Sequence, residues 1–289
     1  MDTILVTGGT GTVGRPLVNM LGELPVALRV VAKQPPAWPL PDNARFAAAD
    51  VEDKTAIEPL LEGVTAIFIH PRATKLAAGP LLDLAARQGV RRVVAYSAIN
   101  VDEPEADQPS RFQGDRNKEV EEAVVASGLD WTVLRPATFM TNIIQMWGPQ
   151  LARGDVIYGA YGDAREAVLD PRDLADCIGQ VLVERSHVGE RIELSGPHTL
   201  GFRDMVILLG QALGRPIIFQ EVPADTIRAQ MVGAGMPSDF VDSFLKRSER
   251  LTREPGKAAP GVKRILGREP RSFSDWAREN AAAFRRQPS

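Results

Sequence analysis

The stretch VTGGTGTVGRPLV, residues 6–18, constrains the fold more than any other part of this 289-residue chain. Its glycines Gly8, Gly11 and Gly14 lie three residues apart, between an apolar run at 3–7 and a helical pattern that begins at Gly14. In such a place the first glycine permits a tight turn, the second lets backbone approach a pyrophosphate, and the third lets helix pack on strand. The first N–H groups of the helix then face the phosphates.

The sequence therefore predicts a dinucleotide-binding loop rather than a glycine turn without a ligand. The hydroxyl groups of Thr10 and Thr12 add hydrogen-bond donors to it. The loop residues expected to contact the dinucleotide are Gly8, Thr10, Gly11, Thr12, Val13 and Gly14.

Apolar runs alternate with helical patterns through the first half of the chain. The expected strands are near-continuous apolar runs, which is typical of strands buried on both faces of a parallel sheet. They lie at 3–7, 26–32, 45–49, 65–69, 92–96 and 131–135, and the helices lie at 14–21, 54–61, 76–88 and 117–126. This alternation predicts an α/β fold, a Rossmann-like doubly wound parallel sheet.

The second half predicts a smaller, mostly helical C-terminal lobe. A helix from Asp170, its N-cap, to about 183 and a strand at 191–194 are expected to return to the sheet. Further helices are expected at 202–213, 224–232, 238–251 and 272–284, with a strand at 216–221 and a loop at 254–261. We therefore expect an NAD(P)-binding domain at 1–150, with a returning helix and strand at about 170–195, and a substrate or partner lobe at 196–289.

Composition excludes several classes of protein. The formal net charge of −3 gives no basic field for nucleic acid. The single cysteine, Cys177, excludes an internal disulfide and fits a reducing cytoplasm, and its apolar neighbours predict an inert core thiol rather than a nucleophile. No apolar run approaches the ~18 residues of a membrane span, and the N-terminus does not resemble a signal peptide. His187 and His198 lie in turns too scattered for a metal site.

The spacing G-x-x-G-x-x-G resembles that of the short-chain dehydrogenase/reductase superfamily, in its extended and atypical branches. Four further segments narrow the resemblance: VVAYSAINV, VEEAVVASGLDWTVLRPATFMTN, LDPRDLADCIGQVL and REPRSFSDWARENAAAF. Together they are similar to the NmrA-like NAD(P)-binding proteins, a family that includes quinone reductases and redox-sensing regulators. The likeness covers nearly the whole chain.

The end of the second expected strand, VVAKQPPAWPLPD, bears on the choice of cofactor. NAD-specific sites place a carboxylate about 20 residues after the glycine loop, whereas NADP sites favour a basic residue. The chain has no acidic residue between Glu23 and Asp42, and Lys33 lies just past the strand. An ammonium group there can meet a 2′-phosphate. We therefore expect NADP(H) to be preferred over NAD(H), the alternative being that Lys33 is a solvated surface lysine.

The resemblance implies further cofactor contacts. Asp50 and Val51 occupy the place where this family contacts the adenine, although Asp50 can equally cap the helix expected near Lys54. His70 and Pro71 are implied to lie beside the cofactor ribose, the alternative being a structural histidine. In open α/β sheets the ligand lies beyond the carboxyl ends of the strands. The residues expected there after the sixth strand are Ala137, Thr138, Phe139 and Asn142, the last two matching positions that face the cofactor in relatives.

A catalytic acid is not evident. Standard short-chain dehydrogenases use Tyr-x-x-x-Lys, but the residues four positions after the three tyrosines are Asn100, Gly162 and Arg165. The resemblance implies a His or Lys where this chain has Asn117, which can hydrogen-bond a carbonyl but cannot act as a general acid. Ser97, at the end of the fifth strand, either hydrogen-bonds the nicotinamide or a substrate carbonyl or only ends the strand.

These observations favour an NADPH-dependent reductase of a quinone-like or other conjugated carbonyl acceptor, because a quinone can take its protons from water. Two alternatives stay open: a non-catalytic NADP(H)-sensing regulatory protein with a protein partner, and a silent binding module. We expect the metal-free protein to bind neither nucleic acid nor membrane.

Overall fold

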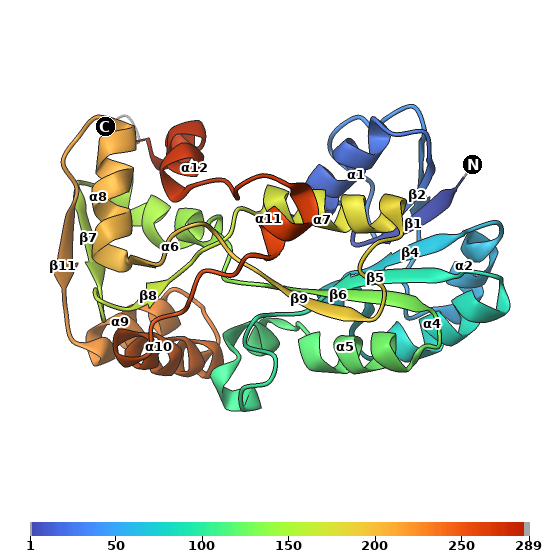
Figure 1. Cartoon of the computed structure of the whole chain (residues 1–289). Coiled ribbons are helices and arrows are strands. Elements are labelled where there is room, and N and C mark those ends of the chain that lie inside the picture. The colour runs from blue at the N-terminus through green and yellow to red at the C-terminus, as the bar shows by residue number, and fades with distance from the viewer. Residues whose placement is uncertain (1, 286–289) are drawn as a thin grey trace.

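The computed structural model describes residues 2–285, and a parallel seven-stranded sheet forms the centre of its larger domain (Figure 1). The strand order is β3-β2-β1-β4-β5-β6-β9. The strands are β1 (Thr3–Thr7), β2 (Ala27–Ala32), β3 (Ala44–Ala48), β4 (Ala66–Ile69), β5 (Arg92–Tyr96), β6 (Asp130–Pro136) and β9 (Glu190–Leu194). The order reverses between β1 and β4, the place at whose carboxyl edge such sheets bind ligands. The predicted Rossmann-like doubly wound fold is confirmed.

Helices cover both faces of the sheet because alternate strand residues point to opposite faces. One face carries α1 (Gly14–Gly22), α7 (Pro171–Glu184) and α11 (Gly261–Leu266), above the sheet in Figure 1. The other carries α2 (Lys54–Ile57), α4 (Ala78–Arg87) and α5 (Asn117–Ala126). The short α3 (Pro71–Thr74) follows β4 directly.

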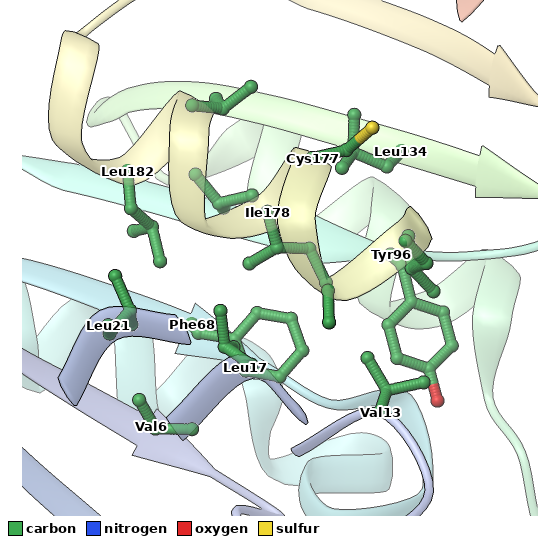
Figure 2. Close-up of a cluster of buried hydrophobic side chains, with 14 of the residues drawn as sticks. Val6, Val13, Leu17, Leu21, Phe68, Tyr96, Leu134, Cys177, Ile178 and Leu182 are labelled. Carbon is green, nitrogen blue, oxygen red and sulfur yellow. The ribbon is translucent and has the colours of Figure 1, made fainter. Parts of the chain in front are cut away.

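The core on the first face is formed mainly by α1 and α7. Figure 2 shows Leu17 and Leu21 of α1 opposite Ile178 and Leu182 of α7, over the strand residue Phe68. Cys177 lies fully buried in this core, where burial raises the pKa of its thiol. This agrees with the predicted inert thiol. Asp170 caps α7 as predicted, since its carboxylate accepts a hydrogen bond from the backbone N–H of Arg172.

Three-ten turns interrupt the first domain where the sequence predicts longer helices or loops. They are η1 (Glu58–Leu61), η2 (Lys75–Ala77), η3 (Glu105–Asp107) and η4 (Pro109–Gln113). The helix expected at 54–61 divides into α2 and η1 at Pro59, whose ring cannot donate a backbone hydrogen bond. The helix expected at 76–88 begins as η2 and continues as α4.

The remaining elements build the second lobe, at the left of Figure 1. They are α6 (Asn142–Leu151), β7 (Val156–Gly159), β8 (Arg165–Glu166), β10 (Leu200–Gly201), α8 (Phe202–Leu213), β11 (Ile218–Glu221), α9 (Ala224–Gly233), α10 (Ser238–Arg253), α12 (Phe273–Glu279) and η5 (Ala281–Phe284). Trp147, Trp276 and Phe284 fill its core. Because α6 packs in this core, the division expected at residue 150 falls within the lobe, whereas the sheet strand β6 ends at Pro136. Over residues 2–285, no helix has the length and apolar character needed to cross a membrane.

Candidate functional site

The glycine loop joins β1 to α1 at the carboxyl edge of the sheet. Gly8 adopts a left-handed backbone conformation with φ +64°, and the N–H of Gly11 donates to its carbonyl oxygen. A Cβ on Gly14 would lie 2.2 Å from that same oxygen, so only glycine lets α1 begin this close to the turn. Within residues 2–285, the backbone N–H groups of Thr12, Val13 and Gly14 have no acceptor. Free N–H groups at a helix N-terminus, with no side chain at Gly11, fit the pyrophosphate of a nicotinamide dinucleotide.

His70 follows β4 directly, as the N-cap of α3, and lies against this loop. A Cβ on Gly8 would lie 2.9 Å from the His70 ring, and one on Gly11 would lie 3.9 Å from its Nε2. The backbone N–H of His70 donates to the Thr7 hydroxyl at 2.8 Å, and Thr7 donates in turn to the carbonyl of Phe68. The structure thus brings His70 to the predicted loop. Its neighbour Pro71 is buried as the first residue of α3.

A second aromatic residue, Tyr96, completes this group and was not among the residues predicted from the sequence. Because Ile69 pairs with Ala95 in the β4–β5 register, the residues that follow these two, His70 and Tyr96, lie side by side. His70 Nε2 is 3.0 Å from the Tyr96 hydroxyl oxygen. Burial lowers the pKa of His70 to about 4 and raises the pKa of Tyr96, so both groups are neutral near pH 7.

An ion pair connects His70's neighbourhood to the start of α5. Arg72 donates two hydrogen bonds to the carboxylate of Asp115, at 2.8 and 3.0 Å. Two residues further, Asn117 is the first residue of α5 and is 5% exposed. Its side-chain N–H donates to the Ser110 hydroxyl at 3.2 Å, while its Oδ1 is buried without a partner among the described residues.

Ser97, the other predicted catalytic residue, is buried and its hydroxyl donates to Glu121 at 2.7 Å. Glu121 also accepts hydrogen bonds from Arg135 and Arg191. Burial acts to raise the pKa of Glu121, but these hydrogen bonds outweigh it and hold that pKa below its ordinary value. Sequence reasoning missed this network, because its members come from β5, α5, β6 and β9. The hydroxyl proton of Ser97 is therefore committed to a carboxylate.

Lys33 and Asp50 were predicted to contact different parts of the cofactor, and the structure pairs them. Lys33 Nζ is 2.6 Å from Asp50 Oδ2, and the two side chains are 63% and 39% exposed. The hydrogen bond from Lys33 lowers the pKa of Asp50. The alternative that Asp50 caps the following helix is wrong, because Asp53 accepts the N–H groups of Thr55 and Ala56 at the start of α2. Val51, beside Asp50, is buried in the core.

The residues after β6 lead from the sheet into the lobe. The Ala137 N–H donates to the carbonyl of Leu194, and the Thr138 hydroxyl donates to Glu166 at 2.8 Å. The Phe139 ring lies edge-on to Tyr96, with 6.4 Å between ring centroids. Asn142 begins α6 and is exposed. Thus Phe139 joins the group around the glycine loop, whereas the Thr138 hydroxyl is held by the lobe.

The chain matches a family of NAD(P)H-binding proteins and is similar to known reductases. Residues 8–179 match the family described as NAD(P)H-binding. The (4-alkanoyl-5-oxo-2,5-dihydrofuran-3-yl)methyl phosphate reductase of Streptomyces griseus subsp. griseus is 35% identical, over 97% of this chain and 99% of that protein. The NAD(P)H azoreductase of Xenophilus azovorans is 28% identical, over 97% and 99%.

Solved structures share the fold at lower identity. The NADPH-dependent quinone oxidoreductase QOR2 from Escherichia coli has a TM-score of 0.77 at 18% identity, over 96% of this chain and 98% of that chain. NmrA, a negative transcriptional regulator, has a TM-score of 0.67 at 18% identity, over 96% and 95%.

Proposed function

Because this chain belongs to the NAD(P)H-binding family of oxidoreductases, with the fold of the NmrA-like atypical short-chain dehydrogenases/reductases, we propose that it is an NADPH-dependent reductase of a conjugated carbonyl compound such as a quinone. The observation that carries the proposal is Asn117 at the start of α5. There an amide, not an acid, stands beside the group formed by Arg72 and Asp115. In this proposal the site binds a reductant and orients a carbonyl, and the residue at position 117 is a hydrogen-bond donor that cannot act as a general acid.

The cofactor half of the proposal rests on the glycine loop and Lys33. The free N–H groups of Thr12, Val13 and Gly14 would hold the pyrophosphate. Lys33, exposed just past β2, would meet the 2′-phosphate of NADPH by exchanging its present partner Asp50 for the phosphate. The proposed contacts of His70, Pro71 and Phe139 are with the ribose and nicotinamide end.

When bound, the reduced nicotinamide supplies a hydride to the acceptor. The amide of Asn117 has one N–H engaged by Ser110, which leaves its second N–H to donate to an acceptor carbonyl. That hydrogen bond orients and polarises the carbonyl but delivers no proton. A quinone spreads the developing negative charge over its ring and can be protonated by water. A simple ketone forms a localised alkoxide and needs a proton during the reaction.

The relatives support an electron-poor, conjugated acceptor. The name of the S. griseus reductase describes a ring carbonyl beside an alkanoyl group, and the X. azovorans enzyme is a reductase of azo compounds. Each of these acceptors can delocalise the charge that reduction brings. We therefore propose that a conjugated acceptor, rather than an isolated ketone or alcohol, is the substrate class.

The test is steady-state oxidation of NADPH with a quinone and with an alicyclic ketone, side by side. We expect the quinone to react faster by about 10²–10⁴-fold, the usual contribution of a general acid to a ketone reduction. Asn117→Ala should lower quinone turnover through lost orientation, and Asn117→His should raise ketone turnover by supplying a proton. Faster turnover of the ketone by the wild type would contradict the mechanism. Tight NADPH binding with no turnover of any conjugated acceptor would favour a sensing protein instead.

A further inference from the structure

We infer that Tyr96 is a further cofactor-binding residue, whose hydroxyl group donates a hydrogen bond to an oxygen on the nicotinamide half of the dinucleotide, either its ribose or its phosphate. This inference rests on the proposed dinucleotide binding. It concerns affinity only and does not depend on which acceptor is reduced.

The Tyr96 hydroxyl accepts a hydrogen bond from His70, but its own proton has no acceptor among the described residues. The backbone N–H of Arg72 donates to His70 Nδ1 at 3.2 Å, so this nitrogen carries no proton in the neutral ring. The proton is therefore on Nε2, which donates to the Tyr96 oxygen at 3.0 Å. With the oxygen accepting from His70, its own O–H must donate elsewhere. Within the described residues, His70 is the only hydrogen-bonding partner of this hydroxyl.

The hydroxyl also lies beside the glycine loop rather than deep in the core. Figure 2 shows the Tyr96 ring next to Val13, with its oxygen directed away from the sheet core. The ring of His70, its partner, lies 2.9 Å from where a Cβ of Gly8 would be and 3.9 Å from where a Cβ of Gly11 would be, and Gly11 is the glycine expected to face the pyrophosphate. Tyr96 is 8% exposed, so a hydroxyl donor left unpaired here destabilises the protein unless a ligand accepts its hydrogen bond.

The strand order places Tyr96 on the side of the nicotinamide half of the cofactor. In the order β3-β2-β1-β4-β5-β6, Lys33 follows β2 on one side of β1, whereas Tyr96 ends β5 on the opposite side. A dinucleotide whose pyrophosphate lies on the loop after β1 therefore extends its 2′-phosphate towards Lys33 and its nicotinamide half towards Tyr96. Phe139, which follows β6, flanks the Tyr96 ring on that same side.

Tyr96 is a fixed donor and not the missing acid. Its pKa is raised by burial, so the hydroxyl stays protonated at neutral pH. The ring is also held in place by stacking with Phe68, at 6.2 Å between centroids.

The experiment is equilibrium titration of the full chain with NADPH and with adenosine 2′,5′-bisphosphate. The bisphosphate lacks the nicotinamide, the ribose attached to it and the phosphate that this ribose carries. Tyr96→Phe should weaken NADPH binding by at least about threefold, and by about tenfold or more where the acceptor is a phosphate oxygen. Its affinity for adenosine 2′,5′-bisphosphate should stay within twofold of the wild type. Tyr158→Phe, on the half-exposed tyrosine of β7, is the matched control and should change neither affinity.

Two results would overturn the inference: NADPH affinity unchanged in Tyr96→Phe, or equal losses for NADPH and the bisphosphate, which would show a general distortion of the loop. Thermal unfolding of the ligand-free variants distinguishes a structural role from a binding role. Loss of a purely structural hydroxyl would lower the melting temperature without a selective loss of NADPH affinity. A wild type that binds NADPH but reduces no acceptor would contradict the proposed function and leave the Tyr96 inference standing.

Discussion

At the scale of single residues, Gly11 and Gly14 have different reasons to be glycine. A Cβ on Gly11 would lie 3.4 Å from its nearest neighbour, the Gly8 oxygen, so the folded loop itself has room for a methyl group there. A Cβ on Gly14 would lie 2.2 Å from the same oxygen and 2.6 Å from the Gly9 Cα, inside the folded loop. We therefore expect that Gly11 is needed for ligand binding, whereas Gly14 is needed for the loop to fold.

Gly11→Val should abolish NADPH binding and leave the fold intact, because its side chain would occupy ligand space. Gly14→Ala should instead destabilise the protein by about 1–3 kcal/mol or more, since backbone atoms must move to admit the methyl group. Cofactor titration and urea unfolding of both variants separate the two effects. Undiminished NADPH binding by Gly11→Val would refute the assignment of the loop.

Lys33 should determine the preference for NADPH, and Asp50 should limit it. Lys33→Glu is expected to weaken NADPH binding about ten- to a hundredfold, as loss of a charge-assisted hydrogen bond does. Asp50→Asn releases Lys33 from its ion pair and should strengthen NADPH binding by a few-fold, because exposed pairs are worth about 0.2–1 kcal/mol. Dissociation constants for NADPH and NADH provide the measurement. Equal affinities in the wild type would rule out the preference.

At the scale of elements, the central strands of the sheet, β1, β4 and β5, were predictable because they are apolar on both faces. The predicted 3–7 and 92–96 coincide with β1 and β5, and the others differ by a residue or two at their ends. Helix α6 was not predicted, because Gly148 and Pro149 near its end obscure the helical pattern. The short α11 was not predicted either, since it begins at a glycine and offers only two core residues, Val262 and Ile265, as an apolar pattern.

In the candidate site, features that depend on neighbouring residues were predictable from the sequence, whereas features that depend on contacts between distant segments were not. The glycine loop is a local pattern, so its position between β1 and α1 followed from the sequence. The contact of Tyr96 with His70 depends on the register of β4 and β5, which places residues 26 positions apart side by side. Likewise, the pairing of Lys33 with Asp50 joins the ends of β2 and β3, and no spacing in the sequence indicates it.

Protonation of His70, the residue that joins β4 to α3, should make the stability of the protein depend on pH. His70 caps α3 by accepting the Arg72 N–H, and burial, opposed by Asp115 and aided by Arg72, lowers its pKa to about 4 from 6.5. Because the unfolded chain binds this proton first, His70's contribution is complete above pH 6.5 and is lost as the pH falls to about 4. The difference between the two pKa values corresponds to about 3 kcal/mol.

Urea unfolding at pH 7 and pH 4.5 measures this effect. His70→Asn is the matched variant, because asparagine can cap α3 but does not titrate. The wild type should lose more stability between the two pH values than this variant does. The same loss in both proteins would show that other groups cause the pH dependence.

At the scale of the whole molecule, α10 fastens the lobe to the sheet. Lys246 and Arg250 form ion pairs with Asp107 and Glu103 in the segment after β5. Between them, Arg247 pairs with Glu166 at 2.8 Å, and these side chains are only 14% and 7% exposed. Glu166 also accepts the hydrogen bond from Thr138, so the same carboxylate holds the segment that leaves β6.

Arg247→Met should therefore destabilise the protein by about 3–5 kcal/mol, because it leaves the Glu166 carboxylate buried without its counter-ion. The double variant Arg247→Met with Glu166→Gln should recover most of that loss, since no charge is then buried. Urea unfolding of the two variants and of Arg250→Met, whose pair is more exposed, checks the expectation. Equal losses in the single and double variants would mean that packing, not charge, makes the contribution.

The path of the chain between the sheet and the lobe has a consequence for how this protein can acquire new substrates. The chain leaves the sheet after β6, returns with α7 and β9, leaves again for α8, comes back once more for α11, and re-enters the lobe with α12 and η5. A single cut after β6 would strip that strand of its neighbour β9 and expose the face of α1 that α7 covers. Recombination cannot therefore exchange the lobe as a cassette, and neither evolution nor an engineer can graft a foreign one at one junction. Under the proposed function, in which the lobe binds the substrate, a new substrate range would arise through point substitutions and loop insertions within this interwoven framework.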